Sequence, residues 1–326
     1  MKMRKSLLLG LVTCSVLFAA CGKGDASQDK VIIYTNADDE PVQVMQKVLD
    51  DNGFKDQYTL QTFGTSDLGS KLLAEGTNIE ADLVTMSTFY LKSAQESKQM
   101  FQPLETNLKP LVADVDFAAP FSVQEGAIFY NTDALSEANV PVPASLKDLA
   151  DPKYDNLISI SDIKQSSTAW LLFQALIDAY GKEEARDILT KIYENAGDHF
   201  ESSGSAPLKK VRLGEVPIGF GLRHQAVLDK ENGEPIDYVE GTEGTYTLTE
   251  SFAVVDKGDK TNPKAQEMLN VILEKGRADL IEIYPSPIYE GETVNSAHAA
   301  TNQKVFPEEL TAELLKEHQE LMDGVN

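Results

Sequence analysis

The sequence predicts an α/β protein built from two lobes. Short apolar segments alternate with amphipathic ones in the N-terminal third, a pattern typical of a parallel sheet with helices on its faces. The chain has 326 residues, more than one hydrophobic core usually serves, so a second lobe is expected. An extended segment at 126–131 and a β-rich segment at 246–255 mark where the chain is expected to pass between the lobes.

The first lobe is predicted to comprise residues 31–122 together with 250–326. Gly53 is expected to end its first helix, and Ser66 and Ser87 occupy positions where helix caps belong. Two amphipathic helices at 262–283 and 307–322 are expected to pack on this lobe. Strands are predicted at 31–35, 58–63 and 81–86, and helices at 41–52, 66–74 and 89–97.

The second lobe is predicted to comprise residues 123–249. Its longest helix is expected to begin in the polar segment 165–168 and to end near Gly181. Strands are predicted at 157–161 and 216–220, and further helices at 183–196, at 207–213 and shortly after His224. No internal repeat and no low-complexity tract is found.

The N-terminus has the pattern of a secretory signal. Lys2, Arg4 and Lys5 precede an apolar run at 7–20, which is shorter than the roughly 20 residues that a membrane span requires. The run ends in Leu-Phe-Ala-Ala-Cys, which resembles a bacterial lipobox. We therefore predict a signal peptide at 1–20, lipidation at Cys21 and a flexible tether over 21–30. The alternative is an ordinary signal peptide with a coincidental cysteine.

Charge and cysteine content exclude some functions. The chain has 29 basic and 52 acidic residues, and removal of the three basic residues of the signal leaves 26 − 52 = −26. So acidic a protein is a poor ligand for nucleic acid. Of the two cysteines, Cys14 would leave with the signal and Cys21 would carry lipid. Stability must then come from core burial, which the 42% apolar content permits.

Polar turns follow several predicted strands and open helices. In open α/β sheets, ligands bind beyond the carboxyl ends of the strands, where such turns present free N–H groups, hydroxyls and positive helix ends. The plainer interpretation of each single turn is a helix cap, so the prediction of an anion site depends on their number and on their distribution over both lobes. The candidate ligands are Asn36, Ser66, Ser87, Ser167, Thr168, Ser203, Gly204 and Ser205.

These features together resemble the extracellular solute-binding lipoproteins of bacterial ABC importers. The resemblance is to the branch that binds ferric iron, organophosphates or 2-aminoethylphosphonate, and it covers nearly the whole mature chain. It rests on the strand at 31–34 after the lipobox, the segments 148–154 (DLADPKY) and 213–219 (LGEVPIG), the Ser-Gly-Ser turn at 203–205 and the Glu-Gly-Thr turn at 240–242. The resemblance implies a two-lobed fold of type II that closes on the solute by a hinge.

The same resemblance directs the choice of solute. Ferric-iron binders of this branch carry an adjacent tyrosine pair after the Gly-Glu-Val strand, but here that place reads Leu-Arg-His-Gln at 222–225. Ferric iron prefers anionic oxygen ligands, whereas Arg223 and His224 suit a phosphate or phosphonate. For these two residues, a surface ion pair and a half-buried histidine are the open alternatives. Asp38 and Asp39 are candidates for binding an ammonium group of the ligand, or are simply charges at a helix start.

We therefore expect a monomeric solute-binding protein that delivers a small phosphonate or phosphorylated compound to a membrane permease. No cofactor, no resident metal and no catalytic residue are predicted. A ferric-iron receptor, a hydrolase of small phosphate esters and a signalling lipoprotein are the alternatives. Neither a Gly-x-Ser-x-Gly motif nor a His-Glu-x-x-His motif is present to support a hydrolase.

Overall fold

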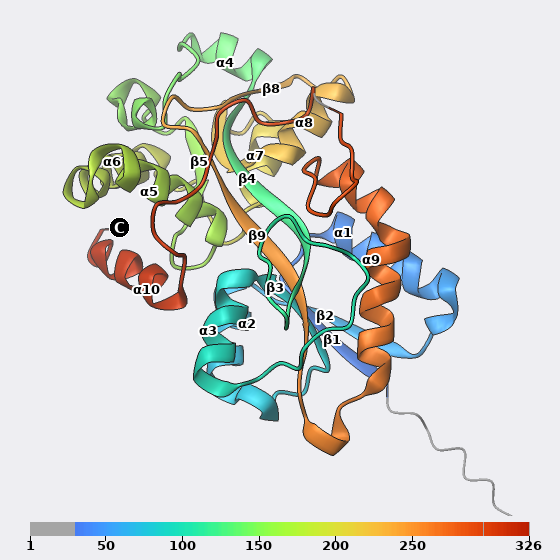
Figure 1. Cartoon of the computed structure of the whole chain (residues 1–326). Helices are drawn as coiled ribbons and strands as arrows, with labels where there is room; N and C mark the ends of the chain where they lie inside the picture. The colour runs from blue at the N-terminus through green and yellow to red at the C-terminus, as the bar shows by residue number, and fades with distance from the viewer. Residues whose placement is uncertain (1–29, 296, 326) are drawn as a thin grey trace, which may run out of the picture.

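The computed structural model describes residues 30–295 and 297–325, which form a mixed α/β structure around a curled sheet (Figure 1). The predicted signal peptide, Cys21 and all of the tether except Lys30 lie outside the described residues. The order of strands along the sheet is β2-β1-β3-β9-β4-β7-β5-β6, with β10 paired to β9 and β8 paired to β4. Parallel strands therefore lie towards both ends of the sheet, and β9 and β4 lie between them.

The N-terminal strands form the parallel sheet that the sequence predicts. They are β1 (Val31–Thr35), β2 (Tyr58–Thr62) and β3 (Leu83–Ser87), and the helices that follow them are α1 (Asp39–Leu49), α2 (Thr65–Glu75) and α3 (Thr88–Lys98). Side chains of β1 alternate between two cores. Ile33 packs with Met45 of α1, and Tyr34 packs with Leu72 of α2. Short helical turns, η1 (Asp50–Phe54) and η2 (Gly76–Asn78), end α1 and α2.

Two long strands connect the two ends of the sheet. In β4 (Ala119–Asn131), the first half pairs with β9 and the second half with β7 and β8. In β9 (Thr245–Val254), residues 250–254 pair antiparallel with β3. The predicted extended segment at 126–131 is thus the second half of a strand that begins earlier, at Ala119, with an irregularity between Pro120 and Ser122.

A second set of strands and helices follows β4. Its strands are β5 (Ile158–Ser161), β6 (Phe200–Glu201), β7 (Ile218–Leu222) and β8 (Ile236–Val239). Its helices are α4 (Thr132–Ala138), α5 (Ser167–Tyr180), α6 (Lys182–Ala196), α7 (Ala206–Arg212) and α8 (Arg223–Glu231), with turns η3 (Lys147–Ala150) and η4 (Pro152–Tyr154). The sequence did not predict α4 and β8. Asn131 caps α4, accepting hydrogen bonds from the N–H groups of Asp133 and Ala134.

The C-terminal segment spans both sets of elements. After η5 (Gly258–Lys260), α9 (Pro263–Ile283) packs against α1, and β10 (Gln303–Lys304) pairs with β9. The last helix, α10 (Ala312–Leu321), starts later than predicted and lies beside α5 as well as α3 (Figure 1). The Trp170 indole N–H donates to His318 Nδ1 over 2.9 Å, which explains why α10 does not pack on the N-terminal elements alone.

Within 30–295 and 297–325, none of the helices combines the length and the apolar character needed to cross a bilayer.

Candidate functional site

Two adjoining hollows lie between the N-terminal elements and the second set. The outer hollow has a volume of about 650 Å³ and the inner hollow about 80 Å³. Asn36 and Asp38 after β1, Phe63 and Gly64 after β2, and Ser203 after β6 line both hollows. The turns after β1 and β2 are called the β1 side, and those after β5, β6 and β7 the β5 side. The structure thus brings together helix starts that are far apart in sequence.

The β1 side is fixed by short hydrogen bonds at the strand end. The Ala37 N–H donates to Thr35 Oγ1 over 3.0 Å, and Thr35 Oγ1 lies 2.5 Å from Thr85 Oγ1 of the neighbouring strand. This turn places Asn36 and Asp38 beside the hollows. The Asn36 amide donates to Thr65 Oγ1 over 3.2 Å, so the turns after β1 and β2 hold each other.

The β5 side consists of two serine-rich turns in contact. Ser166 caps α5 by accepting from the Thr168 N–H, and Ser161 donates to the Ser203 carbonyl over 2.8 Å. A Cβ atom at Gly204 would lie 2.0 Å from Thr168 Oγ1, so only glycine allows the two turns to approach this closely. Ser167, Thr168 and Gly204 line the inner hollow.

Two hydrogen bonds join the β1 side to the β5 side. Ser205 Oγ donates to Asp38 Oδ1 over 2.8 Å, and Ser66 Oγ donates to the Lys164 carbonyl over 2.9 Å. Ser66 and Ser205 both line the outer hollow. These hydroxyls therefore hold the two sides together.

The charges in the outer hollow are segregated by side. Asp38, Asp39, Glu40 and Asp67 come from the β1 side, and Lys164, Lys209 and Arg212 from the β5 side. Lys164 is paired with Asp323, and Arg212 with Asp229 over 2.5 Å. Lys209 forms no ion pair within salt-bridge distance among the described residues, but its positive charge opposes the rise in the pKa of Asp38.

Two carboxylates line the inner hollow: Glu250 is buried, and Asp38 is partly buried. Burial raises the pKa of Asp38, and the hydrogen bond from Ser205 opposes that rise. Burial also raises the pKa of Glu250 to about 7, although Ser87 donates to the Glu250 carboxylate over 2.5 Å. Ser87 lies fully buried beneath this carboxylate and does not line either hollow. The prediction that Ser87 faces the gap is therefore wrong, because its hydroxyl is used by Glu250.

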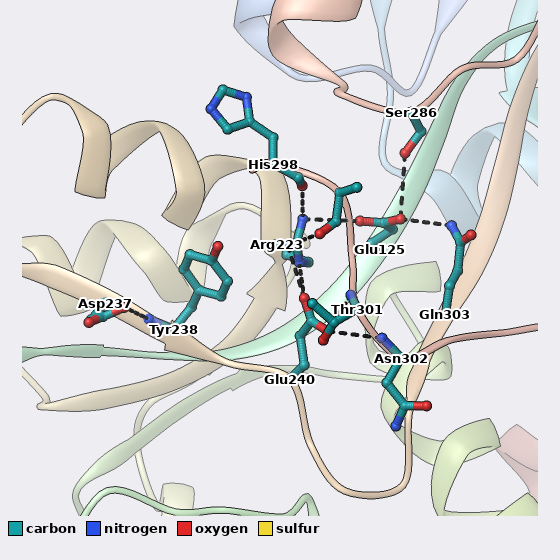
Figure 2. Close-up of polar contacts among 11 residues, drawn as sticks. Glu125, Arg223, Asp237, Tyr238, Glu240, Ser286, His298, Thr301, Asn302 and Gln303 are labelled. Carbon is teal, nitrogen blue, oxygen red and sulfur yellow. Dashed lines mark hydrogen bonds and ion pairs between the residues drawn. The ribbon is translucent and has the colours of Figure 1, made fainter. Parts of the chain in front are cut away.

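Arg223 is also placed away from the hollows, contrary to prediction. Its side chain is 1% exposed and lies between Glu125 and Glu240, at 3.4 Å and 2.9 Å. Its guanidinium also donates to the carbonyls of His298 and Ala299 (Figure 2). Arg223 therefore fastens the segment before β10 onto the second set of elements. Two carboxylates and two carbonyls occupy the donors that were predicted to bind an anion.

His224 is buried as well and does not line either hollow, so the prediction that it binds the phosphate or phosphonate is also corrected. Its ring packs edge-on against Tyr284 with 4.6 Å between centroids. Burial, with a contribution from Arg223, lowers the pKa of His224 to about 3. The imidazole is therefore neutral near pH 7 and offers no positive charge to an anionic solute.

Several residues that line the hollows were not predicted from the sequence. Glu250 and Gln124 come from the crossover strands β9 and β4, and their sequence context is that of ordinary strand residues. Lys209 lies in α7, where basic residues near a helix end are common. The charge of Lys209, in the helix that follows the Ser-Gly-Ser turn, was the available signal for an anion site.

Within 30–295 and 297–325, no group of three or more His, Cys, Asp or Glu side chains is arranged to hold a metal ion. None of the residues that line the outer or inner hollow is a tyrosine.

The family profile of bacterial extracellular solute-binding proteins matches residues 43–278. An uncharacterized protein of Haemophilus influenzae is 26% identical over 262 residues, which cover 75% of this chain and 73% of that protein. Because the family profile spans more than two thirds of the sequence, the chain belongs to the bacterial extracellular solute-binding proteins.

Solved structures of binding proteins share the fold. The periplasmic binding protein AfuA from Actinobacillus pleuropneumoniae, with exogenous fructose-6-phosphate bound, superposes with a TM-score of 0.78 at 18% identity, covering 92% of this chain and 99% of AfuA. Iron-bound HitA from Pseudomonas aeruginosa superposes with a TM-score of 0.73 at 21% identity, covering 91% of this chain and 99% of HitA. A periplasmic thiamin binding protein superposes with a TM-score of 0.75 at 18% identity, covering 92% of this chain and 97% of the thiamin binding protein. The fold is therefore the two-lobed type II fold of periplasmic binding proteins.

The family assignment accordingly makes the molecule an extracellular solute-binding protein.

Proposed function

We propose that this protein captures a small phosphonate or phosphorylated organic solute in the two hollows and delivers it to a membrane permease. The observation that carries the proposal is the convergence of the turns at 166–168 and 203–205 on a hollow that also contains Lys209. Hydroxyls, free N–H groups and a cation are the partners that a phosphorus oxyanion prefers. The complex of AfuA with fructose-6-phosphate supports the same class of solute.

Capture by closure is consistent with the contacts between the two sides. Binding favours the closed state only through a difference in affinity between the open and closed states, so the solute must touch both sides. We propose that residues 31–122 with 250–326 form one lobe and 123–249 the other. Asn36, Asp38 and Ser66 would contribute from the first lobe, and Ser167, Thr168, Ser203, Gly204 and Ser205 from the second.

Ferric iron is a weaker candidate for this site. Iron-bound HitA shares the fold, but the hollows here contain no tyrosine and include Lys164, Lys209 and Arg212 on one side. Four carboxylates also line the outer hollow, so ferric iron is disfavoured by the missing phenolate ligands rather than by charge.

Anchoring through Cys21 is proposed as well. The lipobox-like sequence at 17–21 would place the protein on the outer surface of the cell membrane as a monomer on a short tether. Incorporation of a labelled fatty acid by the expressed protein, and its loss in Cys21→Ser, would be the expected result. Labelling that persists in the variant would contradict the anchor.

Calorimetric titration tests the choice of solute. The panel is inorganic phosphate, fructose-6-phosphate, 2-aminoethylphosphonate and ferric citrate, and the variants are Lys209→Ala and the matched control Lys210→Ala. Lys210 pairs with Glu201 and lies outside the hollows. We expect a phosphorus compound to bind, Lys209→Ala to weaken it about tenfold, and Lys210→Ala to have no effect. Binding of ferric citrate alone would contradict the proposal.

A further inference from the structure

The turns at 166–168 and 203–205, called the serine turns, share the inner hollow with a buried carboxyl group. Thr168 and Gly204 line this hollow from the β5 side, and Glu250 lines it from the crossover strand β9. The hollow has a volume of only about 80 Å³, and Glu250 is 3% exposed. A phosphorus oxyanion seated against the serine turns would therefore lie beside the Glu250 carboxyl group.

The inner hollow offers no cation to balance that carboxyl group. Among the described residues that line it, none is a lysine, an arginine or a histidine. The other carboxylate in the lining, Asp38, is acted on by the positive charge of Lys209 from the outer hollow. Glu250 accepts hydrogen bonds from two neutral groups, the Ser87 hydroxyl and the Asn36 amide. Glu250 is thus the carboxyl group that an added anion would disturb most.

The titratable groups around Glu250 do not supply a positive charge either. Burial raises the pKa of Glu250, and the negative charge of Asp38, in the turn before α1, raises it further. Tyr284, at the end of α9, is a neutral phenol whose pKa is raised by burial. His224 of α8 packs on that phenol, and burial lowers the pKa of His224 to about 3, so it too is neutral. The residues that pair with Glu250 on β3 and β4 are both serines.

An anion placed next to an ionised Glu250 would be repelled. Two like charges in one buried site disfavour the doubly ionised state, and a proton held between the two groups removes the repulsion. A protonated carboxyl group also gains an O–H donor, which an ionised carboxylate lacks. A phosphorus oxyanion accepts such a hydrogen bond, so the protonated form of Glu250 is the one that matches the solute.

We infer that Glu250 binds the solute as a neutral carboxylic acid, donating its O–H to a phosphorus oxyanion that is seated on the serine turns. The proton comes from solvent on capture and returns to solvent on release, so binding takes up a proton and weakens as pH rises. The inference rests on the proposed function and adds a binding residue and a pH control to the same site. Near pH 7 the proton costs little, because the pKa of Glu250 in the unliganded protein is about 7.

Calorimetry counts the protons that accompany binding. Fructose-6-phosphate and 2-aminoethylphosphonate are titrated into the wild-type protein and Glu250→Gln at pH 6 and pH 8, in pairs of phosphate-free buffers with different ionisation enthalpies. The difference between the two proteins cancels any proton exchanged by the solute itself. From the pKa of about 7, we expect the wild-type protein to take up about 0.9 proton more than the variant at pH 8 and about 0.1 more at pH 6. Wild-type binding at pH 8 without proton uptake would overturn the inference, whether or not the variant folds.

The affinities give an independent readout. The Kd of the wild-type protein relative to that of Glu250→Gln should rise about tenfold from pH 6 to pH 8, because only the protonated fraction of Glu250 binds well. The control Glu96→Gln, at an exposed position of α3, should follow the wild-type protein. A constant ratio without the extra proton would overturn the inference and leave the proposed function standing. Absence of binding by both compounds would overturn the proposed function, and the inference with it.

Discussion

Ser205 donates its hydroxyl to the Asp38 carboxylate across the gap between the two sides of the site, over 2.8 Å. These residues are 167 positions apart in the sequence, and each lies in the turn that precedes a helix. A hydrogen bond to a carboxylate typically contributes about 1.5–3 kcal/mol. This contact therefore favours the closed arrangement and keeps Asp38 beside the hollows.

Removal of this contact should open the protein. We expect Ser205→Ala to shift the population of the unliganded protein towards open conformations, because closure loses a hydrogen bond to a charged group. Small-angle scattering would report a larger radius of gyration. Ser202→Ala is the control, since Ser202 lines the same hollow without a hydrogen bond to the β1 side. An unchanged radius for Ser205→Ala would mean that the contact does not influence closure.

Arg223 is expected to determine stability. Arg223→Ala leaves Glu125 and Glu240 buried without their cation, and breaking a buried ion pair in this way typically costs about 3–5 kcal/mol. We expect a corresponding loss in the free energy of unfolding, measured by urea denaturation. The comparison is Lys209→Ala, which should weaken solute binding with little change in unfolding. A variant at Arg223 with normal stability and weakened binding would restore the role predicted from sequence.

Glu250 should make stability depend on pH. Its pKa is about 7 in the folded protein and about 4.5 when unfolded, so the folded state binds more protons between these values. Stability therefore falls as pH rises from about 4.5 to 7 and then levels off. The groups that surround Glu250 are Asn36, Asp38, Ser87, Gln124 and Tyr284, and none of them is a cation.

Glu250→Gln should remove that dependence. The variant is expected to gain stability relative to the wild-type protein by up to about 3 kcal/mol at pH 8, and by much less at pH 5. Urea unfolding of the unliganded proteins at the two pH values provides the measurement. The same difference in stability at both pH values would show that the Glu250 carboxyl titrates normally.

Gly204 should tolerate no side chain. In Gly204→Ala the new methyl group would meet Thr168 Oγ1 at 2.0 Å, so the turns at 166–168 and 203–205 must separate. We expect solute affinity to fall at least tenfold. Gly64→Ala is the matched control in the same hollow, since its methyl group would meet nothing closer than Asp67 at 3.5 Å. Equal affinities of the two variants would show that the close approach is unimportant.

The sequence predicted most of the fold because local patterns determine most of it. The strand at 31–35 and the helices after 87 and 181 are found within a residue or two of their predicted positions. The packing of α10 beside Trp170 was not predicted, because a histidine in an amphipathic helix does not reveal its partner. The early start of β4 at Ala119 was missed because Pro120 interrupts the strand pattern.

The candidate site was predicted in part for a similar reason. The turns containing Asn36, Ser66, Ser203 and Ser205 follow strand ends, and the ends of parallel strands converge. Arg223 and His224 also follow a strand end, but whether such a side chain faces the gap or the interior depends on its neighbours. Arg223 lies in the interior because it pairs there with Glu125 and Glu240. Both residues are distant from it in sequence, so no local pattern around 223 indicates this position.

The antiparallel pairing of β3 with β9 has a consequence for how the protein is made. Residues 83–87 obtain their neighbour on that side only from residues 250–254, so a nascent chain exposes an open strand edge until most of its length has been synthesised. Neither half can complete its own sheet as an isolated fragment. Truncation before residue 245 would leave an aggregation-prone edge, and export in an unfolded form would postpone that exposure until the whole chain is available.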